Sequence, residues 1–382
     1  MLSAFIRLRN QILVFLACSL FFVFLALRLA VPINLTAVDI GRHVKNGELI
    51  VKGEKDLLFK NYYSFTSPEY PFINHHWLFG VLAYMIWKAW DFAGVQCVYI
   101  ALCLLGLFFF LRAALLRGHG AVVFLCVSLA LPLLWDRREI RPEGLSIFLM
   151  GLYFYVLTKL SLGQIRPGWA FILLPFMQVV WVNSHIFFFM GPLLAALFLW
   201  EGAARNCSVC VRHLLPLLLI LLLVNLINPS GLAGALTPLN IFKGFGYRLA
   251  ENQNVFFMIR RFTNPTYFYF LFTVLFLFLG IGLACFRRES KVNWPFIILS
   301  FFIALAGIKA IRLMMPFGFF FVVMGSFFWG QVEGKVTPRL QTTIRPWIFV
   351  VAIMIGAANF VFFTQPALGV GQIRRGFHDD AH

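Results

Sequence analysis

The chain has 382 residues, of which 61% are hydrophobic, 18% aromatic and only 12% charged. Water-soluble domains carry about 25% charged residues, so this composition excludes a soluble enzyme and predicts an all-α polytopic membrane protein. The formal net charge is +17, but the basic residues stand in short segments between apolar runs rather than in one patch. This distribution excludes a nucleic-acid partner and favours membrane lipids, including phosphate-bearing ones.

Eleven apolar runs are suited to cross a membrane, which predicts about eleven transmembrane helices. The polar residues between them leave no separate soluble domain, so residues 1–382 are expected to form a single transmembrane domain. Several runs are shorter than the roughly 20 residues of a comfortable span, which requires local thinning or burial by neighbouring helices. The runs lie near residues 11–31, 94–112, 119–135, 144–159, 169–183, 186–200, 214–227, 265–286, 294–308, 313–330 and 347–363.

The charges around these runs predict an orientation. Arg7 and Arg9 precede the first run, which is too long for a signal-peptide core, so we expect a retained span with a cytoplasmic N-terminus. Alternation then makes residues 32–93 a first outer loop, residues 228–264 a second large outer loop and residues 364–382 a short outer tail. The short inner segments are basic, as the positive-inside rule requires. The outer segments are also rich in Lys and Arg, so either the orientation is inverted or these charges have a function.

Residues 76–90 are apolar but too short for a comfortable span. Because Trp77, Trp87 and Trp90 are spread along this segment, we expect an amphipathic helix lying at the outer interface. Counting the segment as a crossing would invert every later loop and would lose the basic character of the inner ones. The first outer loop is therefore expected to contain a short interfacial helix.

The seven cysteines are scattered and mostly stand inside apolar runs, where a thiol behaves as a small hydrophobe. They indicate no disulfide framework. Cys207 and Cys210 form a lone CSVC beside Arg212 and His213. Without a second pair, two small loop residues are the preferred interpretation over a zinc site.

The stretch TAVDIGRH, residues 36–43, places Asp39, Arg42 and His43 close to the end of the first apolar run. A carboxylate at the membrane edge between aliphatic neighbours has a raised affinity for protons, so Asp39 is a candidate for general-base or electrostatic work. The alternative is an N-cap for a helix that starts at Ile40.

A second polar segment, DRREIRPE at residues 136–143, carries three arginines. In a helical turn, Arg137, Arg138 and Arg141 would present two or three guanidinium groups to a phosphate. The alternative is that the carboxylates of the same segment neutralise these arginines in a solvated turn. Lys309 and Arg312 stand on an otherwise apolar stretch, where buried cations need an anionic partner.

Histidines form the third polar group. His185, after Trp181 and Asn183, is more often a satisfied interfacial residue than a metal ligand. His75 and His76 could join it around a divalent ion, but the spacing shows no such site. We therefore assign no metal ligand and no cofactor, and a divalent metal stays an alternative.

These segments, in this order, resemble the bacterial polytopic glycosyltransferases of the GT-C type. The resemblance runs from about residue 30 to about residue 320 and rests on order and spacing rather than on any one motif. The matching positions are Asp39 with His43; His75, Trp77 and Leu78; Arg141 with Pro142; Trp181, Asn183 and His185; and Asn228, Pro229 and Gly231.

The resemblance implies a GT-C-like fold in a bacterial inner membrane and transfer of a sugar, usually with inversion, from a polyprenyl-phosphate-linked donor. The acceptor would be an unknown glycan, lipid or protein on the outer face. Asp39 takes the place of the family's acidic residue in the first outer loop and, with His43, is assigned to catalysis. The residues assigned to substrate binding are Arg42, His75, Arg138, Arg141, Asn183, His185, Glu251, Lys309 and Arg312.

Two features depart from this family. His76 stands where relatives commonly have Glu before the Trp-Leu pair, and the chain ends at His382 where many relatives continue into a soluble outer domain. The alternative function is a transporter or flippase for a phosphate-bearing lipid, in which the same cations line a path. The charges lie at the ends of the apolar runs and no internal repeat is visible, which favours the transferase. A structural membrane subunit would leave the two long polar outer loops unexplained.

Overall fold

The computed structural model describes residues 19–33, 35, 39–240, 249–286, 292–334 and 337–364, and over these residues it contains helices and no strand. This confirms the all-α prediction. The predicted outer tail lies almost entirely outside the described residues. Within the described ranges, six helices are long and apolar enough to cross a membrane: Trp77–Arg117, Glu143–Ser161, Ile186–Ala204, Pro265–Phe286, Ile311–Gly334 and Leu340–Phe363. Five shorter apolar helices accompany them: Ser19–Leu29, Gly120–Leu134, Pro167–Val182, Ser208–Val224 and Trp294–Lys309.

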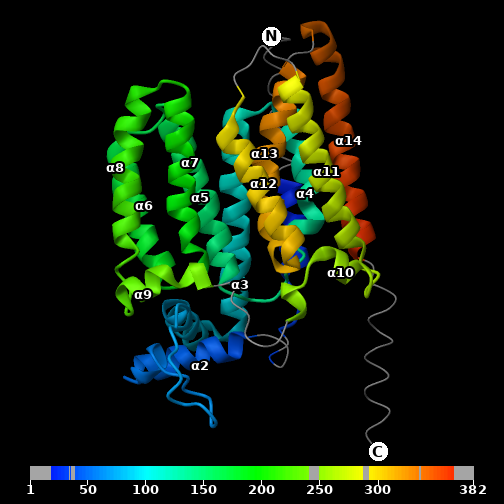
Figure 1. Cartoon of the computed structure of the whole chain (residues 1–382). Helices are drawn as coiled ribbons and strands as arrows, with labels where there is room; N and C mark the ends of the chain where they lie inside the picture. The colour runs from blue at the N-terminus through cyan, green and yellow to red at the C-terminus, as the bar shows by residue number, and fades with distance from the viewer. Residues whose placement is uncertain are drawn as a thin grey trace, which may run out of the picture.

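The long helices stand side by side in two groups on either side of α3 and α5 (Figure 1). On one side lie α6, α7 and α8, and on the other lie α11 to α14 together with α4. The bounds are α3 Trp77–Arg117, α4 Gly120–Leu134, α5 Glu143–Ser161, α6 Pro167–Val182, α7 Met190–Ala204, α8 Ser208–Val224, α11 Pro265–Phe286, α12 Trp294–Lys309, α13 Met314–Gly334 and α14 Pro338–Thr364.

The segments between these helices gather at two opposite ends of the bundle (Figure 1). One end carries α2 (Ile40–Val51), α9 (Gly231–Leu236), α10 (Val255–Ile259) and the 3₁₀ turns η1 (Asp56–Leu58), η2 (Ile186–Phe189), η3 (Thr237–Asn240), η4 (Ala250–Asn252) and η5 (Ile311–Leu313). We call it the α2 end, and we call the opposite end, with the turns around residues 118, 163 and 206, the far end. Backbone hydrogen bonds join separate segments at the α2 end: Leu78 N donates to Asn183 O over 3.0 Å, and Ile311 N donates to Gln253 O over 3.1 Å.

The helix α3 consists of two pieces. Trp90 and Asp91 have non-helical backbone angles, with φ of 55° at Asp91, so the helix is broken between them. The break falls where the predicted interfacial helix of residues 76–90 ends. The first piece lies with α2 below the bundle, and the second piece runs up through its centre (Figure 1).

Two glycines allow α2 to cross the first piece of α3 closely. A Cβ added to Gly47 would lie 2.1 Å from the carbonyl oxygen of Gly80, far closer than real Cβ contacts. Only glycine lets the two backbones approach in this way. The same crossing brings His43 of α2 against the start of α3. The backbone carbonyl oxygen of His43 would lie 2.9 Å from a Cβ added to Gly80.

One cysteine prediction is wrong. Cys207 and Cys210 are joined by a disulfide at the start of α8, instead of being two unlinked loop residues. The first turn of the helix brings their Cα atoms to 5.3 Å, which lies within the range that a disulfide spans. The other described cysteines, Cys97, Cys103, Cys126 and Cys285, are free thiols.

The helix crossing gives a stability prediction. We expect Gly47→Ala to lower the free energy of unfolding by about 1–3 kcal/mol, because the added methyl group forces α2 away from α3. Gly41→Ala, in the same helix, meets no atom within 4 Å and is the matched control. It should be neutral or stabilising, since alanine is the better helix former by up to about 1 kcal/mol. Equal melting temperatures of the two variants in detergent would contradict the close crossing.

Candidate functional site

The arginines of residues 136–143 do not form the predicted helical turn. The helix α4 ends at Leu134 and α5 begins at Glu143, with an irregular loop between them. Pro142 explains the difference, because the residue before a proline is driven away from the helical conformation. Arg138 consequently lies apart from Arg137 and Arg141, near the charges of Asp136 and Arg28.

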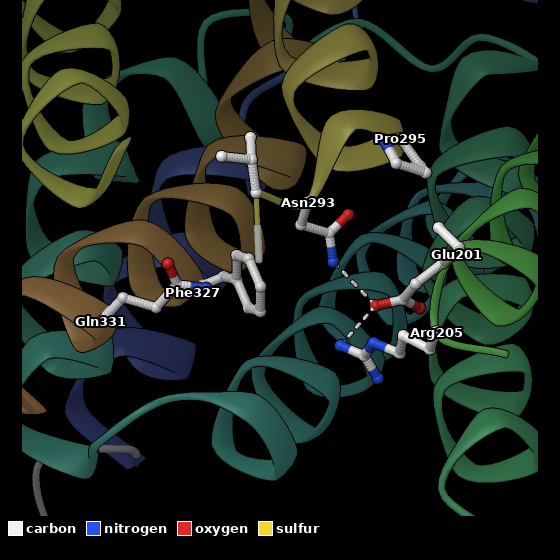
Figure 2. A pocket seen from close by; sticks show the side chains of 8 residues that line it. Glu201, Arg205, Asn293, Pro295, Phe327 and Gln331 are labelled. Carbon is white, nitrogen blue, oxygen red and sulfur yellow. Dashed lines mark hydrogen bonds and ion pairs between the residues drawn. The ribbon is translucent and has the colours of Figure 1, made fainter. Parts of the chain in front are cut away.

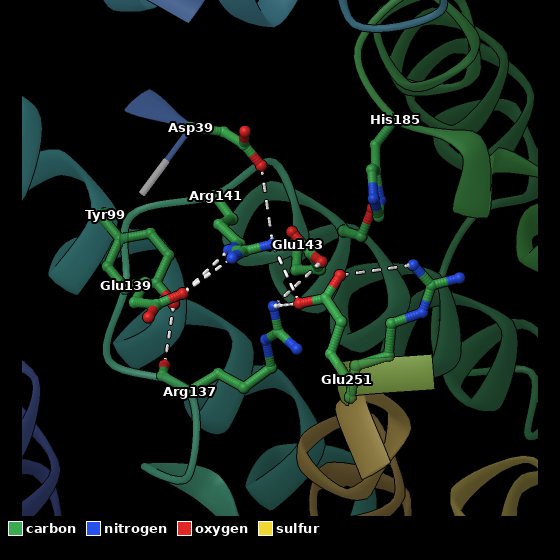
Figure 3. A network of polar contacts seen from close by, with 10 residues as sticks. Asp39, Tyr99, Arg137, Glu139, Arg141, Glu143, His185 and Glu251 are labelled. Atoms are coloured by element: carbon green, nitrogen blue, oxygen red, sulfur yellow. Dashed lines mark hydrogen bonds and ion pairs between the residues drawn. The ribbon is translucent and has the colours of Figure 1, made fainter. Parts of the chain in front are cut away.

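Three arginines converge on the carboxylate of Glu251 (Figure 3). One oxygen, Oε2, accepts hydrogen bonds from Arg137 at 3.0 Å and Arg141 at 3.2 Å. The other oxygen, Oε1, lies 3.9 Å from a guanidinium nitrogen of Arg312. Glu251 stands on η4, the first two arginines on the loop between α4 and α5, and Arg312 on η5. Segments far apart in the sequence therefore meet at one anion.

Three further carboxylates border these arginines. Arg141 contacts Glu139 at 2.9 Å and Asp39 at 3.7 Å, and Arg137 contacts Glu143 at 4.0 Å. Two carboxylates of residues 136–143, Glu139 and Glu143, therefore do pair with these arginines, as the alternative interpretation of the sequence expected. The segment is not a solvated turn, however. The side chains of Arg137 and Arg141 are only 12% and 16% exposed. We call Arg42, Arg137, Arg141 and Arg312 with Asp39, Glu139, Glu143 and Glu251 the arginine cluster.

Asp39 lies at the edge of this cluster. The helix α2 begins at Ile40, as the cap interpretation requires, but the Asp39 side chain makes no capping hydrogen bond. Its carboxylate instead pairs with Arg42 at 3.4 Å and faces Arg141. With 47% of the side chain exposed, Asp39 can be reached by a molecule from solvent while it contacts the arginines.

A tyrosine and a glycine fix the loop that carries Arg137. The hydroxyl of Tyr99, on α3, donates a hydrogen bond to the carbonyl oxygen of Arg137 over 3.1 Å (Figure 3). Gly144 lets this tyrosine approach, because a Cβ at that position would lie 2.6 Å from the Tyr99 ring. Gly144 therefore helps to position Arg137 by allowing Tyr99 to reach its carbonyl oxygen.

Four histidines lie together beside the arginine cluster. The ring centroid of His76 is 5.5 Å from that of His43, 4.1 Å from that of His75 and 5.4 Å from that of His185. Burial, followed by the charge of Arg42, lowers the pKa of His43 from 6.5 to about 4. Burial also lowers the pKa of His75, and lowers the pKa of His76 and His185 well below the usual value. All four rings are therefore neutral near pH 7.

Hydrogen bonds select the tautomers of two of these rings. The Nδ1 atoms of His75 and His76 lie 3.2 Å from the carbonyl oxygens of Ile73 and Ser184. A carbonyl oxygen accepts only, so Nδ1 carries the proton in both rings. Each neutral ring then has an unprotonated Nε2.

A serine and a tryptophan hold His185 in place. Trp181 donates its indole N–H to the hydroxyl oxygen of Ser146 over 2.8 Å, and this hydroxyl lies 2.7 Å from Nδ1 of His185. The hydroxyl has one proton and two lone pairs, so it can hydrogen-bond to Nδ1 of His185 in either tautomer while it accepts from Trp181. His185 is 4% exposed and hydrogen-bonded, which is the satisfied arrangement that the sequence favoured.

Only four of the nine residues assigned to substrate binding belong to the arginine cluster. These are Arg42, Arg141, Glu251 and Arg312. The side chain of Asn183 makes hydrogen bonds within the protein. Its Oδ1 atom accepts from the Trp77 indole N–H at 2.9 Å, and its Nδ2 atom donates to two backbone carbonyl oxygens. His43 and His185 are buried, His75 and His76 are half-buried, and the His43 ring contacts the side chain of Phe79.

Two cations lie outside the cluster. No ion pair joins Arg138 to it among the residues that the structure describes. Lys309 is exposed, so the expectation of a buried cation is wrong there, because at the last residue of α12 its side chain reaches the surface. Within the described ranges, no group of three or more His, Cys, Asp or Glu residues is arranged to hold a metal ion.

Sequence reasoning missed several residues of the site. It left Arg137 out of the substrate-binding set and gave no role to Tyr99 or Ser146. Both hydroxyl groups stand inside apolar runs, where a buried polar atom needs a partner, and this signal could have identified them.

A small cavity of about 70 Å³ lies at the far end, lined in part by Glu201, Asn293 and Phe327 (Figure 2). The Glu201 carboxylate accepts hydrogen bonds there from Asn293 at 2.8 Å and from Arg117 at 2.5 and 2.9 Å. The Glu201 and Arg117 side chains are only 3% and 4% exposed. A cavity of this size holds a few water molecules at most, so we interpret it as part of a buried ion pair that joins α3, α7 and α12.

Comparison with models of known protein families gives no match, and no characterised protein is detectably similar to this chain in sequence. The chemistry of the α2 end is therefore the basis for a functional assignment. That end combines an accessible carboxylate, converging guanidinium groups and neutral imidazoles.

The buried histidines predict a loss of stability in mild acid. The pKa of His43 is 6.5 in the unfolded chain and about 4 in the folded protein, so the unfolded chain binds more protons between these values. Stability is then complete above pH 6.5 and falls as the pH falls toward 4. For His43 alone we expect a loss of about 2 kcal/mol between about pH 7 and about pH 5, measured by unfolding in detergent.

Substitution identifies the residue responsible. His43→Gln should remove much of this pH dependence, and His213→Gln, at the far end, is the matched control. If wild type and His43→Gln lose stability equally on acidification, His43 is not buried in its neutral form.

Proposed function

We propose that the protein is a membrane glycosyltransferase of the GT-C type. It transfers a sugar, with inversion, from a polyprenyl-phosphate-linked donor to a glycan, lipid or protein acceptor. The observation that carries the proposal is the arginine cluster, in which the exposed carboxylate of Asp39 lies 3.7 Å from Arg141. Such an arrangement offers a base for an acceptor and cations for a departing phosphate.

The proposal includes a membrane topology. Each of the eleven apolar helices crosses the membrane, and the short ones are accommodated by neighbours or local thinning. The basic far-end segments then face the cytoplasm of a bacterium, and the α2 end faces outward from the inner membrane. Support comes from the gathering of every segment with catalytic or substrate-binding assignments at one end of the bundle (Figure 1).

The arginines are assigned to the leaving group. When the bond between the anomeric carbon and the phosphate oxygen breaks, its electron pair stays on the lipid phosphate, which gains negative charge. Guanidinium groups bind phosphate oxygens in pairs and are well suited to stabilise this charge. Carboxylates other than Glu251 also hold two of these arginines, Arg137 through Glu143 and Arg141 through Glu139 and Asp39, so these two need little reorganisation during the reaction.

Asp39 is assigned to the acceptor. An acceptor hydroxyl attacks the anomeric carbon from the face opposite the phosphate, and its proton passes to the Asp39 carboxylate. His43, four residues further along α2, donates its backbone N–H to the carbonyl oxygen of Asp39 over 3.0 Å. With its ring packed against α3, His43 acts as a positioning residue for the start of α2.

Substitution of Asp39 tests the proposal. Asp39→Asn keeps the shape of the side chain but removes its ability to accept a proton, so sugar transfer at saturating donor should fall by about 100-fold or more. Binding of the donor should be retained. Asp56→Asn, in an exposed turn of the same loop, is the matched control and should transfer sugar at the wild-type rate.

An unchanged turnover number in well-folded Asp39→Asn would end the assignment of Asp39 as the base. It would also favour the alternative function over the transferase, because a transporter for a phosphate-bearing lipid needs the cations but no base.

A further inference from the structure

We infer that the carboxylate of Glu251 occupies the position of the lipid phosphate, and that Glu251 must leave this position before a donor can bind. The inference rests on the proposed function and deepens it. It changes the assignment of Glu251 from a residue that binds substrate to an internal competitor of the substrate.

The contacts single out Glu251 among the carboxylates of the cluster. It reaches Arg137, Arg141 and Arg312, whereas Glu139, Glu143 and Asp39 each reach only one of these three. A carboxylate with two oxygens among three guanidinium groups copies the way in which arginines bind a phosphate. Glu251 therefore marks the point where the positive charge converges.

The charge balance requires an exchange. Four guanidinium groups face four carboxylates in the arginine cluster, so its formal charge is zero with Glu251 in place. A phosphate that entered beside Glu251 would add an uncompensated anion to a partly buried site. Once Glu251 leaves, the cluster carries one net positive charge and can accept a phosphodiester.

The hydrogen bonding of Arg312 points to a missing ligand. Its Nε atom is buried and has no hydrogen-bond partner within the described part of the chain, and its nearest contact to Glu251 is 3.9 Å. A carboxylate offers two oxygens, whereas the monophosphate formed when the sugar leaves offers three and can contact Arg312 as well as the other two arginines. Glu251 thus occupies the position without completing the hydrogen bonding of Arg312.

The position of Glu251 allows it to leave. It stands on η4, a 3₁₀ turn of three residues, and its side chain is 25% exposed, so rotation about its own side-chain bonds carries the carboxylate toward solvent. Glu143, by contrast, is part of the first turn of α5 and is 15% exposed. After transfer, a returning Glu251 would help to expel the polyprenyl monophosphate product.

Binding of a polyprenyl monophosphate to purified protein in detergent tests this inference. Glu251→Gln removes the competing charge and should bind the probe about 10-fold or more tightly than wild type, the effect of losing a charge-assisted hydrogen bond. Glu69→Gln is the matched control, because Glu69 is exposed and pairs with Lys60 outside the arginine cluster, and it should bind within about 3-fold of wild type. Glu251→Asp, with a shorter reach, should fall between wild type and Glu251→Gln.

The outcomes separate the two proposals. If wild type binds the probe and Glu251→Gln binds it equally or more weakly while keeping its melting temperature, Glu251 holds the arginines in place and the inference is wrong, but the proposed function stands. If neither wild type nor Glu251→Gln binds the probe, the phosphate site fails and the proposed function fails with it. If Glu69→Gln tightens binding as much as Glu251→Gln, a general loss of negative charge explains the effect and the inference is wrong.

Discussion

Guanidinium groups half-buried at the end of an apolar helix bundle need anions, and this requirement organises the α2 end. Moving a charge out of water is costly unless an opposite charge and hydrogen bonds replace the water. Glu251 supplies both to Arg137 and Arg141, and its second oxygen faces Arg312. The requirement joins η4, η5 and the loop between α4 and α5, and Asp39 brings the start of α2 to the same place.

The histidines next to the cluster also avoid an uncompensated charge, but they do so by remaining neutral instead of pairing with anions. The rings of His43 and His185 are buried, and in addition positive charge from Arg42 acts on His43 while charge from Arg312 and Arg137 acts on His185, so protonation is disfavoured. The arginines therefore supply the positive charge of this part of the molecule. Hydrogen bonds to backbone carbonyl oxygens set the tautomers of His75 and His76, so these two imidazoles offer fixed donors and acceptors rather than a variable charge.

Hydropathy predicted the helices well because burial in an apolar medium depends on composition over a whole segment. The run at 265–286 coincides with α11 (Pro265–Phe286), and the run at 119–135 differs by one residue at each end from α4 (Gly120–Leu134). The sequence could not predict the meeting of Glu251 with Arg137, more than a hundred residues away, because packing decides it. Local reasoning also failed where Pro142 excluded a helical turn and where the first turn of α8 brought Cys207 to Cys210.

The most direct test of the account is the release of polyprenyl phosphate from a polyprenyl-phosphate-linked sugar by purified protein in lipid vesicles with a mixture of acceptors. The account predicts release by wild type, strong loss in Arg141→Ala and near-wild-type release in Arg138→Ala, because only Arg141 contacts Glu251 and Asp39. Absence of release by wild type, or an equal loss in the two variants, would contradict the role of the converging arginines.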